Sequence, residues 1–142
     1  MYDWVLLHYK IPSKPTSSRV YVWRKLKTLG AILLQDAVWV LPKTPWTTEQ
    51  FQWLLSEIQE LGGEAMLWES HLLMGNAEGI GAEFRSKADL EYQELLNEFS
   101  QTDCNVSTLS RRYHQIRTRD YFDSEVGESV YKRLEAIREG HK

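Results

Sequence analysis

Residues 20–42, VYVWRKLKTLGAILLQDAVWVLP, decide the fold predicted for this chain. The spacing of Val22, Leu26 and Leu29 predicts one buried helix face, and Gly30 ends the helix because glycine readily adopts the left-handed conformation found there. Two short apolar runs follow, and a tight turn at residues 35–37 makes them antiparallel neighbours, at 31–34 and 38–41. This order of helix, strand and strand is the centre of a βαββαβ unit.

The flanking sequence completes that unit. It adds a strand at residues 4–9, a first helix at 16–29, a second helix at 47–61 and a strand at 64–69. We expect Thr16 or Ser17 to cap the first helix, and Thr47 to open the second with Gln50 as its capping-box partner. We therefore predict an α+β fold, in which residues 1–72 form a ferredoxin-like βαββαβ antiparallel sheet.

The strands are apolar along their whole length, which predicts that both faces of the sheet are buried. A sheet with one face in water alternates apolar and polar residues, whereas these runs do not. We expect the second face to be covered by the C-terminal residues of the chain or by a second copy in a homodimer. The central core is predicted to contain Phe51, Leu54, Ile58, Leu26 and Leu33.

The second half of the chain has a helical pattern. Residues 76–142 are predicted to form an extension of about three helices, packed on the core as one compact domain. The first is a long acidic helix at 77–100. Thr108 is the expected cap of the next helix, and Ser124 of the last.

Length and composition limit the classes of protein to which this chain can belong. The chain has 142 residues, 42% of them hydrophobic, and no apolar run approaches the roughly 18 residues that cross a membrane. Asp3 stands where a signal peptide carries positive charge, and the single cysteine, Cys104, cannot form an internal disulfide. We expect a cytoplasmic protein that makes no membrane contact.

Charge is unevenly distributed although the net charge is only −3. Residues 1–30 contain six basic side chains and one acidic, whereas residues 47–110 contain twelve acidic and two basic. Four arginines then fall between Arg111 and Arg119. Such a bipolar surface can meet a polyanion despite an acidic isoelectric point.

These basic segments supply the candidate duplex-DNA contacts. On a helical wheel, Leu109, Tyr113 and Ile116 cluster together and leave the polar side chains free to reach phosphates. The candidates are Arg111, Arg112, Gln115 and Arg119, with Arg24, Lys27 and Tyr21 as a second patch. The structural alternatives are a solvated charged face in the first helix and, for the arginines, surface ion pairs with Asp120, Asp123 and Glu125.

Other chemistry has weak support. The histidines His8, His71, His114 and His141 and Cys104 have no metal-ligand spacing, and we predict neither a metal nor a cofactor. Glu91, Glu94 and Glu98 share a helix face but match a solvated face better than an acid–base pair. The glycine-rich segment at 74–81 offers a weak oxyanion site, with Gly79, Gly81 and Arg85 as its residues and a flexible hinge as the alternative.

Three segments carry a family resemblance: LLHYKIPS (6–13), RVYVWRKLKTLGAILLQDAVWVLP (19–42) and FQWLLSEIQELGGEAMLW (51–68). They resemble the N-terminal domain of the chromate-resistance protein B family of bacterial regulators, and weaker similarity continues through residues 83–85, 89, 91–92 and 111–113. The resemblance implies repression of a chromate-efflux operon, DNA binding, sensing of chromate or another oxyanion, and a second domain after this one. The chain ends at Lys142, which puts direct chromate sensing in question.

A more distant likeness is to the ferredoxin-like small endoribonuclease associated with CRISPR arrays, through the hairpin after Gly30. That family needs an acidic residue at the end of its first strand, where this chain has Leu7, His8 and Tyr9. We therefore expect no enzyme. The main alternative to a DNA-binding module is a dimerisation or protein-interaction module without chemistry of its own, and a metal-dependent nuclease is a distant third.

Overall fold

The computed structural model describes residues 3–100 and 105–140 and shows an α+β protein with a four-stranded antiparallel sheet and five helices. The chain divides into two compact units, Met1–Ala77 and Glu78–Lys142. The first unit contains β1 (Asp3–Lys10), α1 (Thr16–Leu29), β2 (Ile32–Leu34), β3 (Val38–Pro42), α2 (Pro45–Glu60) and β4 (Glu64–His71). The second contains α3 (Ala77–Phe99), α4 (Val106–Arg117) and α5 (Glu125–Gly140), with Ala77 at the junction.

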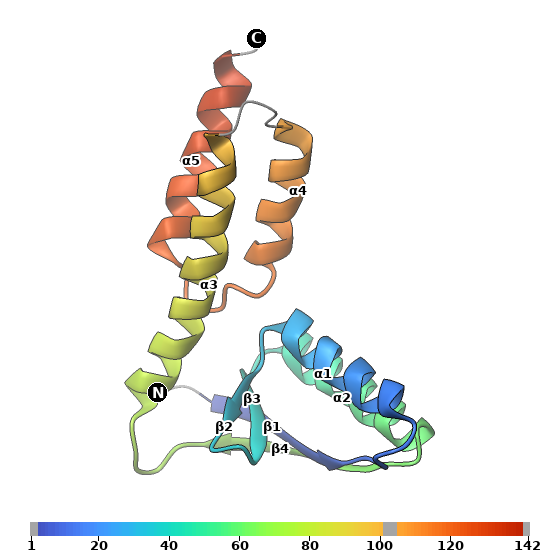
Figure 1. Cartoon of the computed structure of the whole chain (residues 1–142). Helices are drawn as coiled ribbons and strands as arrows, with labels where there is room; N and C mark the ends of the chain where they lie inside the picture. The colour runs from blue at the N-terminus through green and yellow to red at the C-terminus, as the bar shows by residue number, and fades with distance from the viewer. Residues whose placement is uncertain (1–2, 101–104, 141–142) are drawn as a thin grey trace. The chain divides into compact units, whose positions relative to one another are not determined.

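The strands of the first unit are ordered β2-β3-β1-β4, and all three pairings are antiparallel. β1 is central: Leu7 is opposite Trp39 of β3 on one side and Leu67 of β4 on the other. Helices α1 and α2 lie side by side on one face of this sheet (Figure 1). The predicted α+β class and the predicted four-stranded antiparallel sheet are confirmed.

The hairpin between β2 and β3 has a two-residue turn although its sequence contains no glycine. Gln35 and Asp36 both have positive φ, at 50° and 57°, and the Ala37 N–H donates a 2.9 Å hydrogen bond to the Leu34 carbonyl oxygen. Two left-handed central residues match the twist of antiparallel strands. Aspartate tolerates this conformation better than most residues do, so the turn forms without glycine.

Helix α1 ends as predicted but does not begin with the predicted cap. Gly30 has φ 76° and ψ 19°, and its N–H donates a 3.0 Å hydrogen bond to the Lys27 carbonyl oxygen. At the other end Pro15 is the N-cap, without a capping side chain, and its carbonyl oxygen accepts from Ser18 N–H at 3.1 Å. The prediction of Thr16 or Ser17 was wrong, because Thr16 is already helical.

Helix α2 begins two residues earlier than predicted. Thr44 is the N-cap, Pro45 occupies the first turn, and the capping box pairs Thr44 with Thr47, whose Oγ1 accepts from Thr44 N–H at 2.9 Å. The predicted partner, Gln50, belongs to the helix interior. Proline suits the first turn because its missing N–H would have no helical partner.

Most of the predicted core of the first unit is confirmed. Phe51, Leu54, Ile58 and Leu26 are buried, but Leu33 is 40% exposed and was wrongly placed in the core. Leu33 alternates with Ile32, whose side chain is buried, because successive strand residues point to opposite faces.

The tryptophans of the first unit differ in how far they are buried. Trp39 is buried, but Trp53 on α2 is 62% exposed and Trp68 on β4 is 53% exposed. Met66, two residues before Trp68 on the same strand face, is 56% exposed. The coverage of this face by helices or by a partner stays a prediction.

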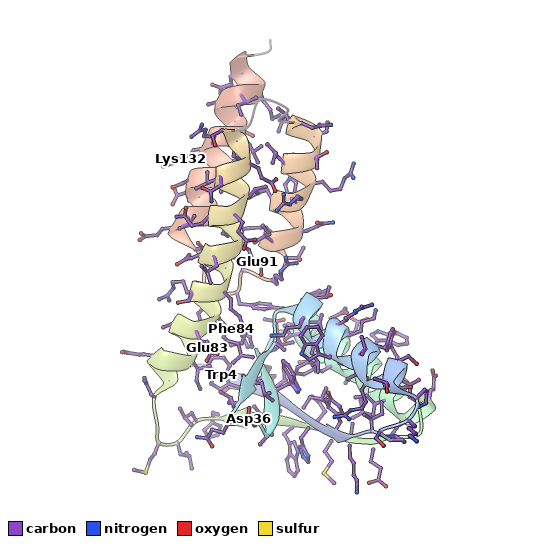
Figure 2. All side chains as sticks on the ribbon, in the orientation of Figure 1. Trp4, Asp36, Glu83, Phe84, Glu91 and Lys132 are labelled. Carbon is purple, nitrogen blue, oxygen red and sulfur yellow. The ribbon has the colours of Figure 1, made fainter. Side chains whose placement is uncertain are left out.

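The second unit has a core of its own between three helices, whose side chains fill the space between the ribbons in Figure 2. Asn105, rather than Thr108, caps α4, and its Oδ1 accepts from Thr108 N–H at 3.3 Å. Ser124 caps α5 as predicted, with its Oγ accepting from Gly127 N–H at 3.2 Å. The shared core contains Ala88, Tyr92, Leu95, Phe99, Leu109, Tyr113, Ile116, Val130 and Leu134.

None of the helices in the described residues is long and apolar enough to cross a membrane.

Candidate nucleic-acid interface

The outer face of α1 carries basic but no acidic side chains. The helix buries Ser18, Val22, Leu26 and Leu29, and this inward stripe leaves the other side chains in solvent. The sequence of α1 contains no acidic residue. Its exposed cations are Arg19, Arg24, Lys25 and Lys27.

None of these four cations forms an ion pair with another described residue. No described carboxylate is therefore in direct contact with these four cations. Arg24 and Lys27 are three residues apart, which places them on the same side of the helix. The predicted second patch is thus brought together, and Arg19 and Lys25 extend it. Sequence reasoning did not select those two, although the absence of acids along the whole helix was a signal for them.

Two aromatic rings lie among these cations. The Lys25 ammonium is 5.7 Å from the centroid of the Tyr21 ring, and the Lys27 ammonium is 5.5 Å from that of the Trp23 ring. Such cation–π contacts hold flexible lysines near the helix surface without cancelling their charge. The face therefore combines fixed positive charge with exposed aromatic surface.

The Tyr21 side chain forms a hydrogen bond with the neighbouring helix α2. Its hydroxyl donates a hydrogen bond to the Glu57 carboxylate on α2, and this bond raises the pKa of the Tyr21 phenol. The hydroxyl would have to leave Glu57 before it could contact a base. The Tyr21 ring remains exposed, so stacking or apolar contact is open to it.

The predicted primary patch, around α4, is organised differently. The Arg112 guanidinium contacts Glu98, and Arg119 makes a two-nitrogen contact with Glu91, including a 2.9 Å bond from Nε to Oε2. Figure 2 labels Glu91 on α3. Ion pairing was the structural alternative for these arginines, but the partners come from α3 rather than from the acids after α4.

The rest of this segment gives a mixed result. Arg117, which is not among the predicted DNA contacts, is 3.0 Å from Asp123 and 3.7 Å from Asp120.

Arg111 is exposed and forms no ion pair with a described residue. Gln115 is also exposed. Its backbone carbonyl oxygen accepts a 2.7 Å hydrogen bond from Thr118 Oγ1. Arg119 lies beyond the end of α4, which ends at Arg117, so it does not share a helix with Arg111, Arg112 and Gln115. Arg111 and Gln115 are thus more accessible than Arg112 and Arg119.

The weak oxyanion site is not assembled as a loop. Gly79 and Gly81 both lie inside α3, and Gly81 is buried near the Phe122 ring. Only the first four N–H groups of a helix lack helical partners, and Gly81 is the fifth residue of α3. Arg85 is exposed one turn later. This arrangement offers at most the first turn of a helix that also carries Glu78.

The carboxylate row on α3 has a structural role. Glu91 and Glu98 are the partners of Arg119 and Arg112, so two of its three members hold the second unit together. Among the residues described, no group of three metal-ligating side chains is placed to hold an ion. Cys104 and His141 lie outside the described residues.

Comparison with known proteins places the chain in a family. The family described as "Protein ChrB, N-terminal" matches residues 19–142. Protein ChrB from Cupriavidus metallidurans (strain CH34) is 27% identical over 137 residues, covering 87% of this chain and 41% of the relative. The chain thus spans about two fifths of the length of that relative. No solved structure matches it. Because the matched residues make up most of the chain, it belongs to the ChrB N-terminal family.

Proposed function

We propose that this chain is the DNA-binding regulatory module of a chromate-resistance regulator, and that it contacts duplex DNA mainly through the outer face of α1. The observation that carries the proposal is the set of four exposed cations on α1, which has no acid in its sequence and whose cations form no ion pair within the described residues. Chromate resistance enters through membership of the ChrB family. We also infer that the βαββαβ order and the strand order β2-β3-β1-β4 make the first unit ferredoxin-like.

The spacing of the cations suits a phosphate backbone. Arg19 and Lys27 are eight residues apart, which at about 1.5 Å per residue separates them by about 12 Å along the helix. Duplex DNA carries about one charge per 1.7 Å of its axis, so several phosphates lie within that reach. Contacts of this kind fix position and supply affinity but do not read sequence.

The arginines after Arg111 rank second as contacts. A guanidinium already paired with a carboxylate must exchange one anion for another when it binds a phosphate, which reduces its net gain. Arg111 and Gln115 are both exposed, so these two residues of the second unit remain candidate DNA contacts.

Salt dependence distinguishes the two surfaces. We would measure the affinity for a duplex fragment from upstream of the chain's own gene at several salt concentrations. The variants are Arg24→Glu with Lys27→Glu on α1, and Arg112→Glu with Arg119→Glu in the second unit. The matched control is Lys132→Glu with Arg138→Glu, which changes the net charge equally at two exposed positions of α5; Lys132 is labelled in Figure 2.

Four phosphate contacts give a slope of log affinity against log salt of about −3.6, from about 0.9 per phosphate. The α1 reversal should reduce that magnitude by about 1.8, whereas the α5 control should leave it nearly unchanged. A reduced slope in the second-unit variant alone would move the contact away from α1. If the wild type does not bind the duplex at any of these salt concentrations, or if the α1 reversal binds with the same affinity and salt slope as the wild type and the α5 control, the function proposed here is wrong.

A second candidate, a dimerisation module, has its own observation. β4 is an edge strand of the described sheet and carries exposed Met66 and Trp68. Exposed edges and apolar surface commonly meet a partner strand or subunit. Sedimentation of the wild type and of Met66→Lys with Trp68→Lys tests it: a dimer that the double variant converts to monomer supports the module, and a monomeric wild type at high concentration contradicts it.

A further inference from the structure

A groove of about 530 Å³ lies between the end of β1 and the first turns of α1. One side is formed by Tyr9 and Ile11, and the other by Val20 and Trp23. Its volume is within the range of small-molecule sites. All of its lining residues belong to the first unit.

The walls are suited to a flat apolar group. Trp23 is 51% exposed, so a large part of its indole surface has no protein neighbour. Tyr9 is partly buried, and burial raises the pKa of its phenol. The Tyr9 hydroxyl therefore stays neutral and places no negative charge beside the groove.

The charges along the groove have one sign. Lys10 and Arg19 contribute to the lining, Thr16 adds a hydroxyl, and no acidic residue lines it. Lys10 is opposite Glu64 in the pairing of β1 with β4, so part of its field is offset there. Arg19 has no ion-pair partner among the described residues, and it is the cation most available to an anion.

We propose that this groove binds one nucleobase together with its phosphate, the base lying against Trp23 and Tyr9 and the phosphate near Arg19 and Thr16. A planar ring with an adjoining anion is the chemistry that aromatic walls and a free guanidinium recognise together. Lys27, whose ammonium lies 5.5 Å from the Trp23 ring centroid, adds positive charge beside the base. Uptake of a single base goes beyond duplex contact through Arg24 and Lys27.

The ligand has two sources with the same chemistry: a free mononucleotide or an unpaired nucleotide in a DNA strand. The first arm of the test titrates the full chain with AMP and with adenosine, and follows the indole resonances by NMR. We expect AMP to shift the Trp23 indole and to bind about tenfold more tightly than adenosine, because only AMP reaches Arg19. The second arm compares a fully paired duplex with the same duplex carrying one bulged adenine.

Three variants identify the groove. Trp23→Ala removes the stacking surface and should weaken the nucleotide contact by about tenfold. Trp53→Ala, which removes an even more exposed tryptophan from α2, should leave it unchanged and is the matched control. Arg19→Ala should reduce the preference for AMP over adenosine while leaving adenosine binding nearly unaltered.

The results distinguish a free nucleotide from an unpaired nucleotide in DNA. They also distinguish the nucleotide site in the groove from the duplex contact through α1. Binding of AMP that Trp23→Ala weakens assigns the free nucleotide, and a preference for the bulged duplex that Trp23→Ala abolishes assigns the DNA strand. If AMP leaves the Trp23 indole unmoved and both duplexes bind equally, the groove is not a nucleotide site. That result would not affect the α1 proposal, which depends on Arg24→Glu with Lys27→Glu and on paired duplex alone.

Discussion

The hydroxyl of Tyr92 on α3 donates a 3.0 Å hydrogen bond to Oδ2 of Asp120, a buried carboxylate between α4 and α5. The same carboxylate accepts from Ser124 N–H at 3.0 and 3.1 Å and lies 3.7 Å from the Arg117 guanidinium. The Ser124 hydroxyl in turn contacts Asp89 on α3. The buried Asp120 carboxylate is stabilised by these donors, the Tyr92 hydroxyl and the Ser124 N–H, and by the nearby Arg117 guanidinium.

Asp120→Ala should therefore destabilise the second unit strongly. It removes the acceptor of Tyr92 and leaves a buried hydroxyl without its partner, at a cost of about 3 kcal/mol. Tyr92→Phe removes one donor only and should cost about 1 kcal/mol. Urea unfolding measures both free energies, and equal losses for the two variants would contradict the assignment of Asp120 as the centre of this network.

Gly127 on α5 should not accept a side chain. A Cβ built there would lie 2.6 Å from the Tyr92 ring, which is fully buried and cannot move aside easily. We expect Gly127→Ala to cost about 2 kcal/mol in the free energy of unfolding, as overpacked cores do.

Gly140→Ala is the control for that substitution, since a Cβ there meets nothing within 4 Å. It should be neutral or stabilise slightly, because alanine is the better helix former. If Gly127→Ala proves equally harmless, the helices have more room than the structure shows.

Leu54→Ala in α2 should cost about 2–5 kcal/mol, because a buried leucine leaves a cavity when it is shortened. Leu33→Ala removes the same atoms from a side chain that is 40% exposed and should cost well under half as much. Reversible denaturant unfolding of the two variants compares them directly. A larger loss for Leu33 would mean that its face of β2 is covered in solution.

Alkaline pH should weaken the fold. Burial, joined by the Asp120 charge for Tyr92, raises the pKa of the phenols of Tyr92 and Tyr121 above the ordinary value near 10. In the unfolded chain these phenols lose their protons first, so the free energy of unfolding is constant below about pH 10 and falls above it, by up to about 1.4 kcal/mol per pH unit for each group.

Tyr121→Phe removes one of these titrations and should make the decline above about pH 10 shallower. Denaturant unfolding of the wild type and of this variant at a series of pH values measures the slopes. A slope that is the same in both proteins would show that burial does not raise the pKa of Tyr121 in solution.

Local sequence was sufficient where neighbouring residues decide the structure. The stripe of Val22, Leu26 and Leu29 with Gly30 behind it defines α1, because helical spacing and a left-handed stop act within a few residues. The same is true of the buried stripe of α4, Leu109, Tyr113 and Ile116. The helix starts were less accurate: Thr44 and Asn105 compete with other capping residues nearby, and the path of the preceding chain selects among them.

Sequence by itself determined that the chain has a four-stranded α+β core followed by helices, and that basic residues gather in α1 and around α4, since periodicity and charge are written in residue order. Only the tertiary structure decided which of those charges are free. Glu98 is 14 residues from Arg112, and Glu91 is 28 residues from Arg119, so no local pattern links them. Packing of α3 beside α4 brings the carboxylates to these arginines, whereas no described carboxylate forms an ion pair with the cations of α1. An ion pair between distant residues depends on the fold, and that dependence moved the proposed DNA contact from the arginines to α1.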